Sequence, residues 1–254
     1  MTHWLYLPEL ASTGTAAVLV ETEAAHAVRA RRLRVGDVVC VFDGAGRTAA
    51  ARISEVVKRP LEVHLTVEAQ QHWAPPAARI HLASALPKGD RQTTMLDMVT
   101  QLGITDFTPV NFERSISRVS TGSQDRWRRV LIESCKQSQR SWMPLVHSSM
   151  DLGDWISDPT DDGVVNLVAH KEGESRNTVI EESLGGAKQV RLLVGPEGGF
   201  SESELARLDH TQATLVSLGE GVLRVEAAAV ALTALVTRTL ADSRIRSQPD
   251  KGSA

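Results

Sequence analysis

The fold class follows from the segment Leu192-Leu193-Val194-Gly195-Pro196-Glu197-Gly198-Gly199-Phe200, which continues into Ser201-Glu202-Ser203-Glu204. It joins an apolar run, a glycine-rich turn and a helix start, because Ser201 and Glu204 have the spacing of a capping box. Such an order is typical of a buried strand that enters a helix in an α/β domain. Glycines allow a ligand close to the backbone, and free amides at a helix start favour anionic or carbonyl groups. An ordinary tight turn has the same composition, so both interpretations stay open here.

A second corner of the same kind follows at Leu215-Val216-Ser217-Leu218-Gly219-Glu220-Gly221-Val222-Leu223-Arg224-Val225-Glu226. Ligands of open α/β sheets bind at the carboxyl ends of the strands. We therefore expect the two loops, coming from neighbouring strands, to form the walls of one pocket. Arg224 and Glu226 are expected at the mouth of the following helix, where a solvated first-turn pair is the alternative interpretation.

The chain from residue 79 onward alternates between strand and helix patterns, which predicts a largely parallel sheet covered by helices. The predicted strands are Ile80–Ala85, Ile104–Val110, Val164–Ala169, Val190–Val194 and Ala213–Leu218. The predicted helices are Arg91–Leu102, Gln124–Gln137, Ser201–Leu208 and Glu226–Leu240.

The first part of the chain has a different pattern, that of a small β-rich domain. Two strand-like runs, Val38–Phe42 and Ala49–Val57, flank the turn sequence Asp43–Arg47, and Leu61–Val67 alternates with period two. Adjacent prolines then mark a linker. We expect residues 1–72 to form the first domain, 73–78 the linker, 79–242 the α/β domain and 243–254 a flexible tail.

The composition excludes several classes of protein. The 254 residues carry a net charge of −3, and only two of them are cysteines. This low cysteine count argues against a disulfide scaffold and suits a reducing compartment. No apolar run is long enough to span a bilayer and no secretion signal is visible, so we expect a cytoplasmic protein without a membrane partner. Neither GxxxxGK[ST], HExxH nor GxSxG occurs, and we expect no metal.

Two local clusters of positive charge stand out in this weakly acidic chain. Seven Arg or Lys against two acids lie between Arg114 and Arg140, and four arginines follow His26 within residues 29–34. Such clusters bind phosphates, although a single charge run is usually a solvated surface. His170, at the end of a predicted strand, also has two interpretations: it lines the pocket, or it has a structural role only.

An ordered set of short motifs gives the chain a resemblance to a known family. The motifs are His26, Arg32, Gly36-Asp37, Phe42-Asp43-Gly44, Leu86-Pro87-Lys88-Gly89-Asp90-Arg91, Gln101-Leu102-Gly103, Glu113-Arg114-Ser115, Cys135, Gln137, Arg140, Pro144 and the two glycine-rich loops. In this order they resemble the 16S ribosomal RNA uridine-N3 methyltransferases, the RsmE family of the knotted SPOUT superfamily. Three positions depart from the family pattern: Gly221 replaces an arginine, Ala227 a threonine, and Lys136 an acid.

The resemblance implies a fold and an activity. The fold would be an N-terminal PUA-like β-barrel followed by a SPOUT-type α/β methyltransferase domain with a C-terminal trefoil knot. The protein would be a homodimer with its cofactor pocket at the subunit interface. It would transfer the methyl group of S-adenosyl-L-methionine to N3 of one uridine in 16S rRNA of the 30S subunit.

The resemblance also assigns roles to residues. Arg224 would stabilise the developing uracil oxyanion, and Glu226 would orient Arg224 or act as a base. The cofactor would be held by Leu167, Val168, Ala169, His170, Val194, Gly195, Pro196, Glu197, Gly198, Gly199, Leu218, Gly219, Val222 and Leu223. RNA would be bound by Arg29, Arg32, Arg34, Lys88, Arg91, Arg114, Gln137 and Arg140.

Two other functions are compatible with the sequence. One is a related knotted enzyme that methylates tRNA or a ribose 2′-hydroxyl, against which the PUA-like first domain argues. The other is a non-catalytic RNA-binding module that has kept the fold, against which binding of S-adenosylmethionine would count.

Overall fold

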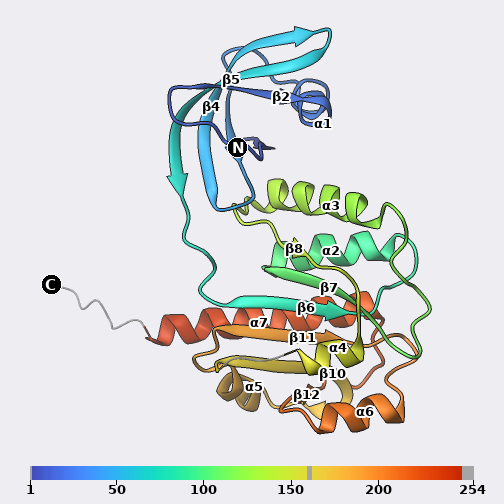
Figure 1. The fold of residues 1–254 in the computed structure, drawn as a ribbon. Coiled ribbons are helices and arrows are strands. Elements are labelled where there is room, and N and C mark those ends of the chain that lie inside the picture. Colours follow the sequence, from blue (N-terminus) through green and yellow to red (C-terminus); the bar gives the residue numbers. More distant parts are fainter. Residues whose placement is uncertain (1, 159–161, 248–254) are drawn as a thin grey trace, which may run out of the picture. The chain divides into compact units, whose positions relative to one another are not determined.

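A computed structural model describes residues 2–158 and 162–247, and Figure 1 shows the course of the chain. The chain divides into two compact units. The first consists of residues 1–75 and 131–143, and the second of residues 76–130 and 144–254. In the part of the chain that is described, no helix is both long and apolar enough to cross a membrane.

The first unit is built on a five-stranded sheet with the order β1-β3-β4-β5-β2. Its elements are β1 (Trp4–Tyr6), β2 (Ala16–Val20), α1 (Glu21–Ala25), the π-helical η1 (His26–Ala30), β3 (Val38–Phe42), β4 (Arg47–Lys58) and β5 (Leu61–His72). The predicted hairpin turn is confirmed, because β3 and β4 pair antiparallel across it. Asp43 closes the turn by accepting hydrogen bonds from the backbone N–H groups of Ala45 (2.7 Å) and Arg47 (3.0 Å).

The second unit contains a seven-stranded sheet in which every pairing is parallel, as predicted. Its strands are β6 (Arg79–Ser84), β7 (Asp106–Asn111), β8 (Leu145–Val146), β9 (Met150–Asp151), β10 (Val164–Glu174), β11 (Gln189–Val194) and β12 (Thr214–Val216). The order is β12-β10-β11-β6-β7-β8, with β9 also paired to β7. Because β10 lies between β11 and β12, the two glycine-rich corners follow strands that are not neighbours, so the expected adjacency of these strands was wrong, although both corners line one cavity.

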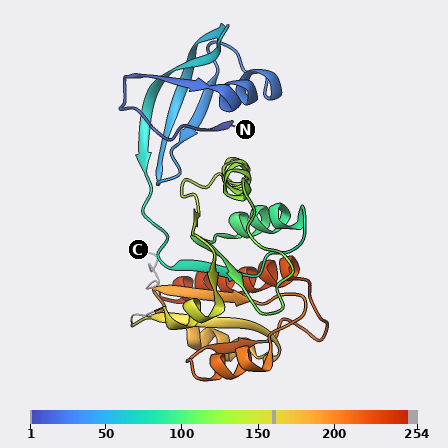
Figure 2. The same cartoon turned by 45° about the vertical axis from the view of Figure 1, so that its right-hand side comes forward.

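Helices cover both faces of this sheet, as Figure 2 shows from a second direction. They are α2 (Arg91–Leu102), α4 (Leu152–Ser157), α5 (Asn177–Leu184), α6 (Glu202–Asp209) and α7 (Val225–Ser247). Helix α3 (Ser123–Ser138) begins in the second unit, and its residues from 131 onward belong to the first. Helix α7 packs against β6 and β11 and contacts α2 and α5, whereas α4 contacts β7 and α6. Helix α7 continues to Ser247, into the segment predicted as a tail, and residues 248–254 lie outside the described part of the chain.

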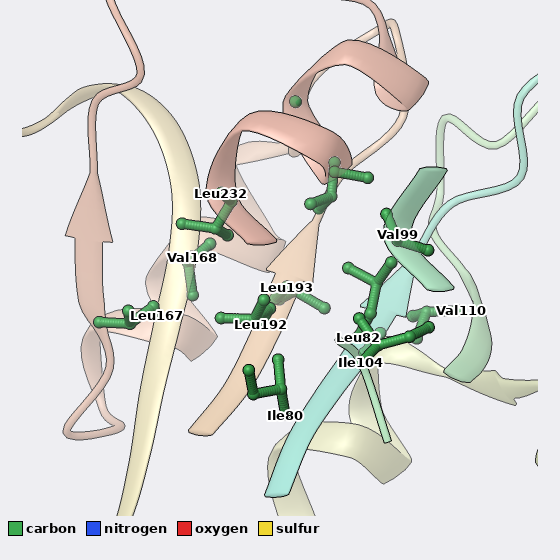
Figure 3. Packing of buried hydrophobic residues seen from close by; sticks show 14 of the residues in the cluster. Ile80, Leu82, Val99, Ile104, Val110, Leu167, Val168, Leu192, Leu193 and Leu232 are labelled. Carbon is green, nitrogen blue, oxygen red and sulfur yellow. The ribbon is translucent and has the colours of Figure 1, made fainter. Parts of the chain in front are cut away.

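Aliphatic side chains from the central strands form the core of the second unit (Figure 3). Leu82, Leu167 and Leu192, from three adjacent strands, are fully buried together with Leu232 of α7. Burial of each such side chain is worth about 1.5–3 kcal/mol, which fixes the strands and the loops at their ends. The strand order places β11 and β12 on opposite sides of β10. The trefoil knot implied by the resemblance stays a prediction.

A polar network near the amino ends of β6 and β7 surrounds the buried carboxylate of Asp106. Asp106 accepts hydrogen bonds from Arg79 (2.6 Å) and His147 (2.9 Å), and His81 is bonded to Thr108 (2.7 Å). Burial raises the pKa of Asp106, but these hydrogen bonds outweigh it and hold that pKa below its ordinary value. Burial lowers the pKa of His81 from an ordinary 6.5 to about 4.

We expect the free energy of unfolding to fall as the pH is lowered from about 6.5 to about 4. In this interval His81 binds a proton in the unfolded chain but stays neutral in the folded one, so the proton favours unfolding; above it the effect vanishes. A pKa difference of this size corresponds to at most about 3 kcal/mol. Urea unfolding at pH 5 and pH 7.5 should show a smaller difference for His81→Gln than for the natural protein. His210→Gln, at an exposed histidine, is the control; equal pH dependence in all three proteins would contradict the prediction.

Candidate active site

A cavity of about 420 Å³ lies in the second unit at the carboxyl ends of β10, β11 and β12. Its walls come from the second half of β10, from the loops that follow β11 and β12, and from residues of α6, α7 and the segment after β7. The lining residues are Arg114, Ala169, His170, Lys171, Glu172, Val194, Gly195, Pro196, Glu197, Gly198, Gly199, Phe200, Leu205, Leu218, Gly219, Gly221, Val222, Leu223, Val225 and Ala228. The volume is in the range of sites that hold a small organic ligand or cofactor.

The loop after β11 is fixed at both of its ends. The predicted capping box is confirmed: the Ser201 hydroxyl accepts from the Glu204 N–H (3.2 Å), and Glu204 accepts from the Ser201 N–H (2.8 Å). Gly199 has a φ of +68°, a conformation that favours glycine, and its N–H donates to the carbonyl of Pro196 (2.8 Å). The loop is therefore a built turn that presents backbone to the cavity.

Arg114 reaches this loop from the segment after β7. Its guanidinium Nη1 donates to the carbonyl oxygens of Gly198 (2.9 Å) and Phe200 (3.1 Å). The absence of a side chain at Gly198 leaves room for it, since a Cβ there would lie 3.2 Å from the Cβ of Arg114. Arg114, proposed from the sequence as an RNA contact, thus forms part of the cavity wall.

The wall formed by β10 depends on an irregularity in the sheet. Ala169 and Glu174 both pair with Val216 of β12, so the residues between them bulge out of the ladder. Gly173 permits this arrangement, because a Cβ there would lie 2.5 Å from the backbone of Leu215 and Val216. The bulge carries His170, Lys171 and Glu172 to the cavity. Sequence reasoning reached His170 and missed the other two, since the predicted strand ended before them.

All of the proposed cofactor-binding residues except Leu167 and Val168 line the cavity. Those two are fully buried within β10 and belong to the core. The cavity also includes Gly221 of the predicted Leu218–Leu223 loop, and residues that the sequence reasoning did not select: Lys171, Glu172, Phe200, Leu205, Val225 and Ala228. Several of these are apolar residues in loops or helix starts, where composition gives no sign of pocket lining.

The proposed catalytic residues, Arg224 and Glu226, lie on either side of Val225, the first residue of α7. Arg224 is exposed, and its guanidinium has no partner among the described residues. Glu226 is paired with Arg91, the first residue of α2, at 3.4 Å, and not with Arg224. The guanidinium of Arg91 also lies 3.8 Å from the carboxylate of Glu197 in the loop after β11. The structure thus brings Arg91, proposed as an RNA contact, to the edge of the cavity.

The remaining proposed RNA contacts lie on the surfaces of both units. Arg29, Arg32, Arg34 and Gln137 are exposed and Arg140 is half-buried in the first unit, and Lys88 is exposed in the second. Not every residue of the basic run is available to a ligand. The side chain of Lys136 is 4% exposed and binds the carboxylates of Glu23 (3.0 Å) and Glu133 (2.8 Å). Among the described residues no cluster of side chains could hold a metal ion.

Comparison with protein families matches both units of the chain. Residues 74–237 match the RNA methyltransferase domain, and residues 21–66 match the RNA methyltransferase PUA domain. The parallel sheet with a glycine-rich cavity and the small β-rich unit are therefore those of a two-domain RNA methyltransferase.

Individual relatives narrow the family. Over 241 residues the chain is 32% identical to the ribosomal RNA small subunit methyltransferase E of Mycobacterium tuberculosis, and the matched region covers 91% of this chain and 89% of that protein. The Bacillus subtilis protein of the same name is 29% identical over 226 residues, covering 85% and 88%. A crystal structure of the Neisseria gonorrhoeae enzyme of this name, bound to S-adenosyl methionine, is 26% identical with a TM-score of 0.82, covering 94% and 98%. The chain belongs to the ribosomal RNA small subunit methyltransferase E family.

Proposed function

We propose that this protein transfers the methyl group of S-adenosylmethionine to N3 of a single uridine in 16S rRNA of the small ribosomal subunit. The observation that carries the proposal is the cavity made by the Gly195–Gly199 and Leu218–Leu223 loops in a chain of this family. The names of the relatives support an rRNA substrate, and the ligand of the Neisseria gonorrhoeae enzyme supports the cofactor. The choice of uridine N3 rests on the ordered sequence motifs.

The residues of the cavity fit S-adenosylmethionine. Apolar side chains of Leu218, Val222 and Leu223 offer a surface for an adenine ring, and the glycines leave backbone groups accessible for hydrogen bonds. The carboxylates of Glu172 and Glu197 line the same cavity and suit the positive charges of the ligand. When bound, this cofactor supplies an electrophilic methyl group on a sulfonium.

The chain must make N3 of the uridine nucleophilic. N3 carries a proton and is a poor nucleophile until that proton leaves, so the protein has to favour the uridinate and orient it. Arg224 would stabilise the negative charge that develops on the uracil oxygens, because a fixed cation favours the deprotonated ring. Glu226, whose carboxylate is paired with Arg91 in this structure, would orient Arg224 or accept the proton. Since N3 lies on the pairing edge, the uridine must be unpaired or flipped out of its helix.

Assembly and RNA binding complete the proposal. A homodimer with the cavity at its interface is supported by the exposed apolar side chains at the cavity, Val222 (85% exposed) and Leu223 (39%). Exposed arginines in both units would bind phosphates of the 16S rRNA or of the assembled 30S subunit. We place the enzyme in the cytoplasm with its substrate.

Methyl transfer from labelled S-adenosylmethionine tests this function. Purified 30S subunits, free 16S rRNA and bulk tRNA, taken from cells that lack the gene, would be offered in parallel and digested to nucleosides for mass spectrometry. We expect 3-methyluridine from 30S subunits or 16S rRNA. A ribose-methylated nucleoside, or label only in tRNA, would favour the related knotted enzyme; cofactor or RNA binding without any product would favour a non-catalytic module.

A further inference from the structure

A second cavity, of about 250 Å³, lies beside the first in the second unit. The end of β7 and the segment after it, the start of α4 and helix α6 form its walls. Glu113 lines this smaller cavity, and the next residue, Arg114, lines the larger one. The backbone N–H of Glu113 donates to Oε1 of Glu204 (2.8 Å), the residue that completes the capping box. One hydrogen-bonded segment therefore separates the two cavities.

Two arginines line the smaller cavity, and neither makes a hydrogen bond or a salt bridge with another described residue. They are Arg118, in the segment after β7, and Arg207 of α6. Gly153, in the first turn of α4, leaves room for Arg207, because a Cβ at this glycine would lie 2.5 Å from Nη2 and 3.3 Å from Cζ of the arginine. The guanidinium of Arg207 thus lies against the backbone of α4. Both cations are available to a ligand.

Two carboxylates line the same cavity, and each is bonded to a neighbouring side chain. Glu113 accepts a hydrogen bond from the hydroxyl of Ser203 (2.6 Å), and Asp151 accepts one from the side-chain amide of Asn111 (3.1 Å). Hydrogen bonds from Ser203 and Ser201, and then the charges of nearby arginines, hold the pKa of Glu113 below its ordinary value. Glu113 is therefore ionised at neutral pH. A ligand of this cavity meets cations and anions together, which does not suit a phosphate group alone.

Guanine is the RNA base whose edges match such a pair of groups. Its O6 and N7 are adjacent acceptors for a guanidinium, and its N1–H and N2–H₂ are adjacent donors for a carboxylate. No other RNA base presents two adjacent acceptors on one edge and two adjacent donors on another. We propose that the smaller cavity binds a guanine base of the substrate RNA, with Arg207 on the acceptor edge and Glu113 on the donor edge. Since N1–H is free only in an unpaired base, this guanine would come from a single-stranded part of the RNA.

The place of the smaller cavity gives the guanine a role in the choice of substrate. Because the cavity adjoins the cofactor site, a base held there would bring a nearby uridine of the same strand to the methyl group. A lost phosphate contact weakens the binding of every RNA and lowers its dependence on salt, whereas a lost base contact removes the preference for one base. That the RNA is the methylation substrate rests on the proposed function, whereas the binding of guanine is measured without it.

Nucleotide titrations test the site without methyl transfer. Ligand-observed NMR of the full chain would give the affinities of guanosine, inosine, adenosine, cytidine and uridine 5′-monophosphates and of inorganic phosphate, with S-adenosylmethionine in excess to occupy the larger cavity. The five nucleotides share one phosphate group, so their differences report the base, and inosine lacks only the 2-amino group of guanosine. We expect guanosine monophosphate to bind at least about tenfold more tightly than the other four nucleotides, and inorganic phosphate to bind more weakly still.

Substitutions assign the two edges of the base. Arg207→Gln and Glu113→Gln should each weaken the binding of guanosine monophosphate about tenfold, and Glu113→Gln should also narrow its advantage over inosine monophosphate. Gly153→Ala should weaken binding severalfold, because the added Cβ displaces the guanidinium of Arg207 while its charge stays. Arg238→Gln, at an exposed arginine of α7, is the control and should keep the natural affinity. Thermal unfolding checks that each variant is folded.

Several results would overturn the proposal: no binding of guanosine monophosphate, equal affinity for all five nucleotides, equal affinity for inorganic phosphate, or natural affinity in Arg207→Gln. With the RNA that the natural protein methylates, Arg207→Gln should raise KM about tenfold and keep kcat, since the contact concerns binding and not the chemical step. An unchanged KM would overturn the role in substrate choice. Absence of 3-methyluridine from the natural protein, with the preference for guanosine monophosphate intact, would overturn the proposed function and leave the guanine site in place.

Discussion

Replacing Arg224 with alanine should lower the methylation rate by about 10²–10³-fold while the affinity for S-adenosylmethionine stays within about twofold. Arg224 is exposed, has no partner among the described residues, and stands between the cavity residues Leu223 and Val225. A cation at this point is free to meet the charge that develops on the uracil oxygens as N3 loses its proton. Removing one group that stabilises the developing charge of a transition state costs about that factor in other enzymes.

The measurement separates catalysis from binding. Single-turnover rates at saturating RNA report the chemical step, and calorimetry with S-adenosylmethionine reports the cofactor site. Arg238→Ala removes an exposed arginine from the same helix, where it pairs with Asp242, and should leave both quantities unchanged. An unchanged rate in Arg224→Ala would remove Arg224 from the mechanism, and a large loss of cofactor affinity would move it into the cofactor site.

Local sequence signals were sufficient for the elements that build the site. The apolar run before Gly195 became β11, and the spacing of Ser201 and Glu204 became a capping box, because both depend on residues a few positions apart. The alternation of strand and helix was likewise enough to predict a parallel sheet. These features are decided within one turn or one strand, where sequence patterns are informative.

Contacts between distant residues could not be predicted from the same signals. Arg91 is paired with Glu226, 135 positions later, and Lys136 with Glu23, 113 positions earlier. From the sequence, both basic residues were expected on a surface that binds RNA. In the fold each is paired with an acid far away along the chain, and no local pattern predicts that pairing. The position of β10 between β11 and β12 is of the same kind, since the partners of parallel strands depend on how the crossovers pack.

Gly195→Ala should weaken the binding of S-adenosylmethionine by about 10–100-fold. A Cβ at Gly195 would lie 2.9 Å from Cζ and 3.0 Å from Cε2 of Phe200, closer than such atoms can approach. The ring cannot yield freely, because it is 8% exposed and packs edge-on against Phe112 with a centroid separation of 5.6 Å. Overpacking of this kind costs about 1–3 kcal/mol. Each 1.4 kcal/mol by which it destabilises the cofactor complex relative to the free protein lowers the affinity tenfold.

Two further variants make this result specific to the wall between Gly195 and Phe200. Gly221→Ala adds the same methyl group to the cavity at a position where a Cβ meets no atom within 4 Å, so its affinity should stay within about twofold. Phe200→Leu shortens the side chain at the clash, and combined with Gly195→Ala it should recover most of the lost affinity. Thermal unfolding without cofactor measures how much Gly195→Ala destabilises the folded protein itself, apart from its effect on cofactor binding. Natural affinity in Gly195→Ala, or no recovery in the double variant, would mean that the wall yields and that close packing of Phe200 on glycine does not shape the cofactor site.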